Sequence, residues 1–346
     1  MRLRATGVQM LLLRNNWGMK RVLVTGGGGY LGSNLLPRLA AADWKVRAMG
    51  PYPPGPDAAP PVDVEWVTGS VLDETSLAEA MADCDAVVHL AARITLWRRD
   101  PAAWRLNTRG PALVAAEARR RGIRMVHCSS IHALDCSADG TITEATPLAG
   151  VERPLYDRSK AVGQRAVLAE VAKGLDAVIC LPTGIIGPID RGSRVNGLIL
   201  AAARGRKVTV AGGFDWVDVR DVAAGITVAL DWGRAGRSYL LSGARAQIST
   251  LMSLGAILAG RPPLRLAFPL EWVRPLAPLG EVVGSRLGTD VFTPAALGAL
   301  ADSPTVSNRR AREELGFLPR PLAMTVRDLL VSAEIDVSAG VGVGGR

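Results

Sequence analysis

The chain has 346 residues, of which 48% are hydrophobic and 21% are charged, so it can bury a sizeable core as one large domain or two joined lobes. No apolar run reaches the roughly 18 to 20 residues that a membrane-spanning helix needs, which predicts a soluble protein with no membrane span. The formal net charge is +9, but more than half of this excess lies in residues 1–21, which hold five cations and no acid. No nucleic-acid-binding motif accompanies the other arginines, which argues against a nucleic-acid partner.

Residues 1–18 precede the first predicted strand and have too short an apolar core, and no small-residue cleavage site, for a secretion signal. Met19 stands directly before KRVLVTG, so we expect the fold to begin there and residues 1–18 to be a disordered extension. The cysteines show no CxxC spacing, and Cys128 and Cys180 lie in apolar, strand-like runs. We therefore expect buried free thiols in a reducing cytoplasm and no metal site.

The segment VLVTGGGGYLG, residues 22–32, joins an apolar run to Gly26, Gly29 and Gly32, and apolar residues at helical spacing follow it. This order predicts a buried strand, a tight turn and a helix. Glycines let the backbone approach a ligand closely, and the free N–H groups where the helix begins, near Tyr30, favour the phosphates of a dinucleotide. A glycine triplet alone also fits a turn in another kind of α/β protein, so its meaning depends on the rest of the chain.

Strands and helices alternate after this turn. The sequence predicts strands at residues 44–49, 86–92, 123–130 and 176–188, and a strand that runs into a turn over 64–73. It predicts helices at 74–84, 101–121 and 153–174. This alternation, with nearly continuous apolar strands, is typical of an α/β fold with a doubly wound parallel sheet of Rossmann type. Ligands of such sheets bind beyond the carboxyl ends of the strands, so we expect residues 26–32, Ser70, Ala91 and Ser130 to line one crevice.

The pattern changes after the strand predicted at 176–188. Glycine-rich turns, short strands and helical segments interrupted by prolines follow, which predicts a smaller C-terminal lobe that closes over the crevice. We expect a dinucleotide-binding Rossmann domain over residues 19–188 and a mainly substrate-binding lobe over 189–332, some of whose segments return to the Rossmann sheet. Residues 333–346 are expected to form a flexible tail.

Tyr156 and Lys160 stand four residues apart in the predicted helix that contains YDRSK, which places them one turn apart on the same face. An ammonium beside a phenol favours the phenolate, so we expect the pKa of Tyr156 to be lowered towards the range of a general acid or base. The same spacing also arises by chance on an exposed helix face. The glycine turn, together with Ser130 at the end of the strand predicted at 123–130, favours the catalytic interpretation.

The motifs TGGGGYLG, HLAA, Asn107, the serine pair at 129 and 130, YDRSK and PTGIIGP together resemble the extended short-chain dehydrogenase/reductases of the NAD-dependent epimerase/dehydratase superfamily. The resemblance covers residues 20–331, and SSIHAL, YDRSKA and FDWVDVRDVA are similar to bacterial dihydroflavonol-reductase-like and 3β-hydroxysteroid dehydrogenase-like members. It implies an NAD(P)-dependent oxidoreductase whose catalytic residues are Ser130, Tyr156 and Lys160. Tyr156 would exchange a proton with the substrate oxygen, Ser130 would hold that oxygen, and Lys160 would bind the nicotinamide ribose.

The resemblance also implies a set of cofactor-binding residues. These are Gly26, Gly29, Tyr30, Leu31, Gly32, Ser70, Val71, Leu90, Ala91, Ala92, Asn107, Lys160, Pro182, Thr183 and Ile185. Asn107 would bridge backbone groups of the sheet behind the site, and His89 is either beside the cofactor or a core histidine. His132 either orients the substrate or is a surface histidine. Relatives commonly dimerise through the helices that hold Asn107 and Tyr156, so the resemblance implies a homodimer.

The chain departs from the family pattern at the end of the strand predicted at 44–49. NAD-binding members carry an acid there that binds the ribose 2′-OH, whereas this chain has Met49, Gly50 and Pro51. Arg47 lies within the strand, and we expect it to point away from the cofactor. No carboxylate repels a 2′-phosphate, so the sequence favours NADP(H) over NAD(H). Ser70 replaces the aspartate that members commonly offer to the adenine.

A second departure concerns the substrate. Sugar-nucleotide members commonly grip the diphosphate with an asparagine and an arginine, at positions that are Gly184 and Phe214 here. Phe214 and Trp216 suit an apolar substrate, although both also fit a simple core role. The leading hypothesis is an oxidoreductase that interconverts a secondary alcohol and a ketone on an apolar or polycyclic small molecule. A sugar epimerase or dehydratase with a tightly bound cofactor, and a catalytically silent dinucleotide sensor, are the alternatives.

Overall fold

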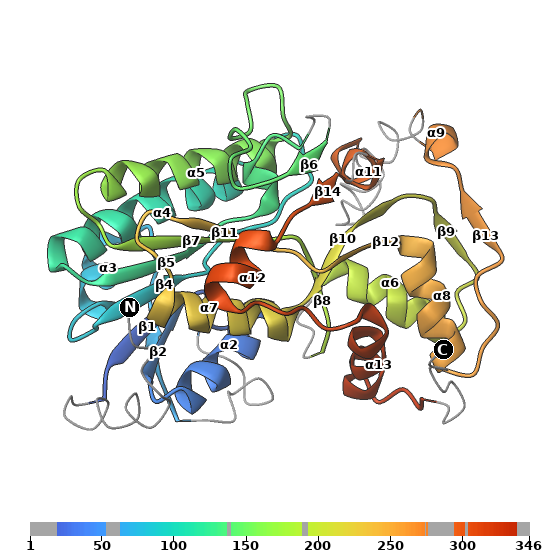
Figure 1. The fold of residues 1–346 in the computed structure, drawn as a ribbon, viewed down its shortest axis with the longest axis horizontal. Coiled ribbons are helices and arrows are strands. Elements are labelled where there is room, and N and C mark those ends of the chain that lie inside the picture. Colours follow the sequence, from blue (N-terminus) through green and yellow to red (C-terminus); the bar gives the residue numbers. More distant parts are fainter. Residues whose placement is uncertain are drawn as a thin grey trace, which may run out of the picture.

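The structure, a computed structural model, describes residues 19–52, 63–136, 140–188, 193–273, 275, 294–301 and 304–337. The predicted extension at residues 1–18 and most of the predicted tail lie outside these ranges. A large sheet and its helices occupy the left of Figure 1, and a smaller group of sheets and helices lies on the right. In the described part of the chain, no helix combines the length and the apolar character that crossing a membrane requires.

The large sheet has seven parallel strands in the order β11-β7-β5-β4-β1-β2-β3. Its strands are β1 (Arg21–Thr25), β2 (Lys45–Gly50), β3 (Val64–Thr68), β4 (Ala86–His89), β5 (Arg124–Cys128), β7 (Ala177–Pro182) and β11 (Ser238–Leu241). The chain order reverses between β1 and β4, which is where open parallel sheets form a ligand crevice at the carboxyl ends of their strands. The predicted Rossmann-type α/β fold is confirmed.

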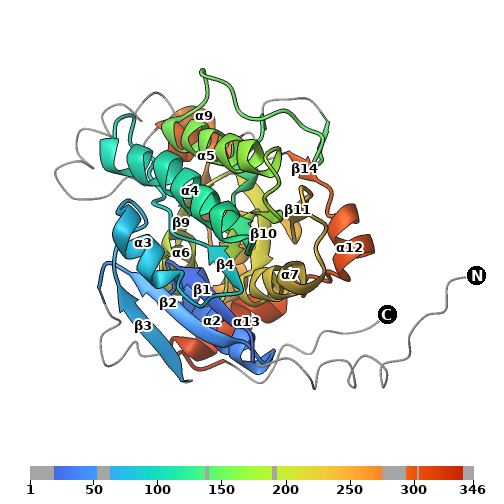
Figure 2. The same cartoon turned by 90° about the vertical axis from the view of Figure 1, so that its left-hand side faces the viewer.

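Alternate residues of the strands supply two separate cores, because successive side chains point to opposite faces. Leu23, Val87 and Met125 belong to one core, and Val24, Val88 and Val126 belong to the other. Helices α3 (Glu74–Ala80), α4 (Pro101–Arg121) and α5 (Leu155–Val171) cover the first face, and α2 (Tyr30–Ala41), α7 (Val219–Trp232) and α12 (Arg309–Leu315) cover the second. Figure 2 shows α4 and α5 on one side of the sheet and α2 and α7 on the other.

The ends of helix α4 follow directly from the sequence. The carboxylate of Asp100 accepts a hydrogen bond from the Ala103 backbone at 2.9 Å and caps the first turn. Gly122 ends the helix in the left-handed conformation, with a φ of 66°. The arginines of the last turn, residues 119–121, lie at the negative end of the helix dipole, where positive charge stabilises the helix. Two of them also bind Glu117.

The remaining elements form the smaller lobe and its connections. They are η2 (Ile131–Ala133), β6 (Thr141–Ile142), β8 (Gly184–Ile186), α6 (Arg194–Ala203), β9 (Val208–Val210), β10 (Gly213–Asp218), β12 (Ala244–Gln247), α8 (Ile248–Leu258), β13 (Leu266–Phe268), α9 (Leu270–Val273), α11 (Pro294–Ala301), β14 (Thr305–Val306) and α13 (Leu322–Ser332). Strands β12, β10 and β8 form one sheet, and β13 pairs with β9. Helices α6, α8 and α13 pack together beside them.

The structure corrects one predicted strand. The strand expected at 176–188 is two strands, because β7 stays in the large sheet while β8 pairs with β10 in the neighbouring one. The chain changes sheets at Thr183, whose hydroxyl donates to the buried carboxylate of Asp215 at 2.7 Å. The strand and turn predicted over 64–73 are present, since β3 ends at Thr68 and the chain then turns towards the Asp73 cap of α3.

Candidate active site

The glycine turn lies at the carboxyl end of β1, at the point where the strand order reverses. Gly26 has a φ of +74°, and a Cβ there would be 2.8 Å from the Ala91 backbone nitrogen. A Cβ on Gly32 would overlap the carbonyl oxygen of Gly27. Helix α2 begins after Gly29 with no side-chain cap and no acid in its first turn. Its first N–H groups are therefore available to an anion, and this turn fits the diphosphate of a dinucleotide.

A cavity of about 950 Å³ opens beyond this turn and continues to the smaller lobe. Most of the residues predicted for the site line it: Gly26, Gly29, Tyr30, Leu31, Gly32, Leu90, Ala91, Ala92, Ser130, His132, Tyr156, Lys160, Pro182, Thr183, Ile185, Phe214 and Trp216. Ser70, Val71, Asn107 and His89 are not among the residues that line it. The chain thus brings together side chains that are up to about 190 residues apart in sequence, from Gly26 to Trp216.

Ser130, Tyr156 and Lys160 meet on one wall of the cavity. Ser130 caps the short helix η2, where its hydroxyl accepts from the His132 backbone at 3.2 Å, and its side chain interacts with that of Tyr156. Lys160 lies one turn further along α5 and is buried. Its ammonium donates to the Cys128 carbonyl oxygen at 3.0 Å, at the end of β5.

The expected lowering of the Tyr156 pKa is wrong for this structure. Burial raises the pKa of Tyr156 well above its usual value, and the hydrogen bond with Ser130 opposes only part of that shift. Burial also lowers the pKa of Lys160, because desolvation disfavours its charged form. Since the Lys160 ammonium is directed at the Cys128 carbonyl oxygen, burial dominates the pKa of the phenol.

Asn107 lies behind the cavity wall. Its side-chain carbonyl oxygen accepts from the Arg93 backbone N–H, and its amide donates to the Arg93 carbonyl oxygen, both at 2.9 Å. The same amide donates to the Ser159 hydroxyl at 3.0 Å. Asn107 therefore fixes the segment that follows β4, whose residues 93–96 line the cavity, against helix α5. The predicted bridging geometry is present, but the backbone that Asn107 bridges belongs to this segment rather than to a strand.

His89 is a core histidine in this structure. Its Nδ1 lies 2.7 Å from the Thr25 hydroxyl, and its ring stacks on that of His127 with centroids 5.5 Å apart. Burial lowers the pKa of His89 to about 3 and also lowers that of His127. Both rings are 1% exposed, so they are neutral at physiological pH.

Three aromatic rings form the wall that faces the smaller lobe. His132 stacks on Phe214 at 5.5 Å between centroids, and Phe214 meets Trp216 edge to face at 5.6 Å. The His132 ring also lies 5.7 Å from that of Tyr156, and its Nδ1 is 3.2 Å from the Asp157 carboxylate. The indole N–H of Trp216 donates to the Ala246 carbonyl oxygen at 2.9 Å, so its polar atom is satisfied away from the cavity.

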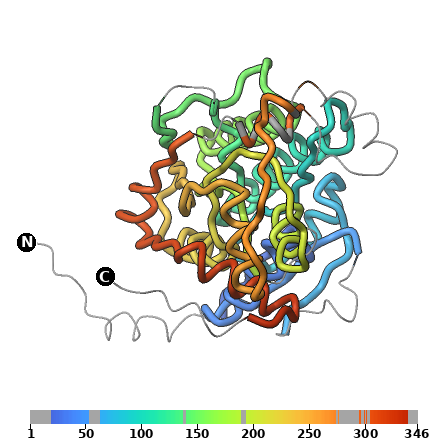
Figure 3. The backbone as a smooth tube through the Cα atoms, turned by 90° about the vertical axis from the view of Figure 1, so that its right-hand side faces the viewer, coloured from blue at the N-terminus to red at the C-terminus, as the bar shows by residue number. Residues whose placement is uncertain are grey.

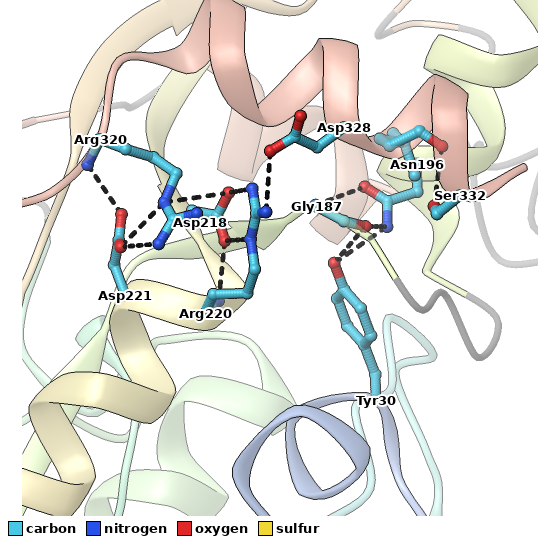
Figure 4. A network of polar contacts seen from close by, with 10 residues as sticks. Tyr30, Gly187, Asn196, Asp218, Arg220, Asp221, Arg320, Asp328 and Ser332 are labelled. Carbon is cyan, nitrogen blue, oxygen red and sulfur yellow. Dashed lines mark hydrogen bonds and ion pairs between the residues drawn. The ribbon is translucent and has the colours of Figure 1, made fainter. Parts of the chain in front are cut away.

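One contact at this site has no signal in the sequence. The Tyr30 hydroxyl donates to the Gly187 carbonyl oxygen at 2.8 Å, and the Asn196 amide donates to both that carbonyl oxygen and the Tyr30 hydroxyl (Figure 4). Helix α2 of the large sheet is thereby joined to helix α6 of the smaller lobe. Figure 4 also shows Arg320 bound to Asp221 and Arg220 bound to Asp328, which hold the chain before α13, and α13 itself, against α7.

Arg47 points away from the glycine turn, as expected. Its guanidinium binds Glu65 at 2.9 Å and the carbonyl oxygens of Ala80 and Ala82, on the far side of β2. At the cofactor end of β2, Trp66 lies against the turn, because a Cβ on Gly28 would be 3.2 Å from its indole ring. Arg47 is therefore not the residue that would meet a cofactor 2′-phosphate.

The parallel sheet, the glycine turn at its switch point and the serine, tyrosine and lysine on one cavity wall define an NAD(P)-dependent oxidoreductase of the Rossmann type. The chain belongs to the NAD dependent epimerase/dehydratase family, whose model matches residues 22–242. The family resemblance drawn from the motifs is therefore confirmed.

Several curated proteins are similar along most of their length. Sterol demethylase protein B of Methylococcus capsulatus is 33% identical over 86% of this chain and 93% of its own. A putative dihydroflavonol 4-reductase of Synechocystis is 32% identical over 75% and 80%, respectively. The 4-hydroxy-2-methyl-3-oxo-4-farnesyl-3,4-dihydroquinoline-1-oxide ketoreductase of Stigmatella aurantiaca is 30% identical over 87% and 92%. Among solved structures, gox2253 superposes with a TM-score of 0.79, at 28% identity over 91% of this chain and 98% of that one.

Proposed function

We propose that the protein interconverts a secondary alcohol and a ketone on an apolar or polycyclic small molecule, with Tyr156 as the acid or base. One observation carries the proposal: the side chains of Ser130 and Tyr156 line the same cavity as the rings of His132, Phe214 and Trp216. In such a cavity the two hydroxyls can hold the carbonyl oxygen of a ketone, and the aromatic wall can contact its carbon skeleton.

Each group of site residues has a separate role in this proposal. The glycine turn and the start of α2 would hold the cofactor diphosphate, and Lys160, Pro182, Thr183 and Ile185 would lie beside its nicotinamide end. The bound cofactor supplies the hydride. The Ser130 hydroxyl would orient the substrate oxygen, and the Tyr156 hydroxyl would give that oxygen its proton.

The apolar wall supports the substrate class. Where sugar-nucleotide members of the family commonly place an asparagine and an arginine, this chain has Gly184 and Phe214, which touch each other: a Cβ on Gly184 would be 2.8 Å from the Phe214 ring. The named relatives that act on a sterol or a farnesylated quinoline are consistent with the same class. A sugar epimerase or dehydratase that keeps its cofactor permanently bound is the second candidate.

For the cofactor we propose a preference for NADP(H) over NAD(H). No carboxylate stands at Met49, Gly50 or Pro51 to bind the ribose 2′-OH and repel a 2′-phosphate. Fluorescence titration of the purified protein with NADPH and NADH measures the preference, and tighter binding of NADH would overturn it.

Two further predictions from the sequence remain. The first is a homodimer formed through α4 and α5, which light scattering can test, and the second is a cytoplasmic location, which cell fractionation can test.

The experiment on the reaction is spectrophotometric. Purified protein is incubated with NADPH or NADH and with a panel of steroid, quinone and simple cyclic ketones, and loss of nicotinamide absorbance is followed. Net turnover that disappears in Tyr156→Phe supports the proposal. Turnover of a nucleoside-diphosphate sugar with no net change in nicotinamide, and a cofactor that survives desalting, would support the sugar epimerase instead.

A further inference from the structure

One edge of the smaller lobe combines exposed apolar side chains with exposed cations. The apolar members are Val208, Leu266, Phe268 and Trp272, which are 37%, 56%, 42% and 68% exposed. The cationic members are Arg204, Arg206, Lys207, Arg261 and Arg265, all exposed. We call these nine residues the β9–β13 patch. Single exposed apolar residues are ordinary, but a contiguous group marks a surface that meets a partner.

Pairing between β9 and β13 gathers the patch. The strands are parallel, and Leu266 lies opposite Val208 while Phe268 lies opposite Val210. Val208, Leu266 and Phe268 therefore share one face of a two-stranded ribbon. Because the strands run in the same direction, the cations that precede each of them gather at one end of the ribbon. Strand β13 crosses the face of the lobe that is turned to the viewer in Figure 3.

The charge of the patch is one-sided. The two segments that form it, residues 204–208 and 261–272, contain five cations and one acid, Glu271. Where the chain is described, none of the five cationic side chains forms an ion pair. An anionic lipid bilayer has an apolar interior and negatively charged headgroups at its surface. Apolar and aromatic side chains can enter the interior boundary while the neighbouring unpaired cations contact the headgroups.

We propose that the β9–β13 patch docks the protein onto the surface of an anionic bilayer. Phe268, Leu266 and Trp272 enter the headgroup region, and the cations contact lipid phosphates. The patch adjoins the cavity wall: Leu270 of α9 packs with Leu300 of α11, the helix whose Pro294, Ala295 and Gly298 line the cavity. If the substrate is apolar, as proposed above, docking would place the cavity beside the phase in which that substrate dissolves.

The experiment is vesicle sedimentation of the full-length protein, which requires no turnover and so fails or succeeds independently of the proposed reaction. Vesicles of phosphatidylcholine alone are compared with vesicles that also contain phosphatidylglycerol, at low and at high salt. We expect binding to the anionic vesicles, weakened by salt. Phe268→Ser with Trp272→Ser should lower the apparent affinity by about tenfold or more. Arg206→Glu with Lys207→Glu should do the same without removing apolar surface.

Two matched controls lie elsewhere on the molecule. Trp232→Ser, the control for the apolar variant, removes a tryptophan that is 62% exposed at the end of α7. Arg105→Glu with Arg309→Glu, the control for the charge variant, reverses two exposed cations on the Rossmann domain. Both controls should bind like the parent. Absence of binding to anionic vesicles, or equal losses in the controls, would overturn the proposal. So would a dimer, detected by light scattering, that the Phe268 and Trp272 changes dissociate, because the patch would then bind a second copy.

Discussion

The indole ring of Trp216 occupies the space that a side chain on Gly184 would need. A Cβ on Gly184 would lie 2.6 Å from Trp216 Cε3 and 2.8 Å from Phe214 Cδ1, because β8 and β10 pair with Gly184 opposite Trp216. The aromatic wall of the cavity therefore depends on a glycine in the neighbouring strand. A polar side chain at position 184 and this pair of rings cannot both be accommodated without displacement.

Gly184→Ala should lower the free energy of unfolding by about 1–3 kcal/mol, because the two rings must shift in a packed site. It should also reduce turnover of bulky ketones. Gly197→Ala is the matched control, since a Cβ there meets no heavy atom within 4 Å in helix α6. The control should stabilise the protein by about 0.5–1 kcal/mol. Urea unfolding of both variants measures the difference, and equal effects would contradict the packing argument.

Tyr156→Phe should lower kcat by about 10²–10⁴-fold while leaving dinucleotide affinity close to that of the parent, because only the proton donor is removed. Steady-state kinetics and fluorescence titration separate the two effects. Tyr52→Phe is a control, since Tyr52 is 80% exposed and should tolerate the change. A Tyr156→Phe enzyme with full activity would mean that another group protonates the substrate.

His132→Ala should change substrate selectivity more than stability. The ring stacks on Phe214 and contacts Tyr156, so its loss should widen the cavity beside the substrate oxygen. We expect the ratio of kcat/KM for a polycyclic ketone to that for a small cyclic ketone to shift by about tenfold, within the range that one apolar contact can supply. An unchanged ratio would assign His132 to the surface.

Tyr30→Phe should cost about 1–2 kcal/mol of stability, since it removes the hydrogen bond to the Gly187 carbonyl oxygen and the one from the Asn196 amide, while Asn196 still reaches that carbonyl oxygen at 2.9 Å. Asn196→Ala should cost more, about 2–3 kcal/mol, because it also leaves the Gly187 backbone N–H without its partner. Urea unfolding provides both values. If the two variants lost the same stability, the contact between α2 and α6 would not depend on Asn196.

The stacked pair His89 and His127 should make the fold sensitive to acid. Burial lowers both pKa values in the folded state, that of His89 to about 3, so the unfolded chain binds more protons below about pH 6.5. This contribution to stability is complete above pH 6.5 and is lost as the pH falls towards 3. His127→Leu should reduce the slope of stability against pH by up to about 1.4 kcal/mol per unit in that window. Urea unfolding from pH 4.5 to pH 8 tests this, and parallel curves would refute it.

Much of the fold was predictable because its signals are local. The glycine turn, the apolar strands and the caps of α4 depend on residues a few positions apart, and helix α4 begins and ends at the predicted residues. The strand at 176–188 was predicted as one because its apolar run is continuous. Its division at Thr183 depends on β10 and on Asp215, which lie about 30 residues further along the chain.

The sequence by itself determined the class of the protein through the joint resemblance of its motifs to a known family, while the spacing within the glycine turn and within YDRSK placed an anion site and a tyrosine–lysine pair on defined elements. Only the tertiary structure decided the ionisation of that pair, because a pKa depends on burial and on the direction of Lys160 rather than on spacing. It also decided that Asn107 braces the cavity from behind, and that Phe214, Trp216 and His132 form one wall. These relationships join residues that are distant in sequence, and such residues become neighbours only when the sheets pack.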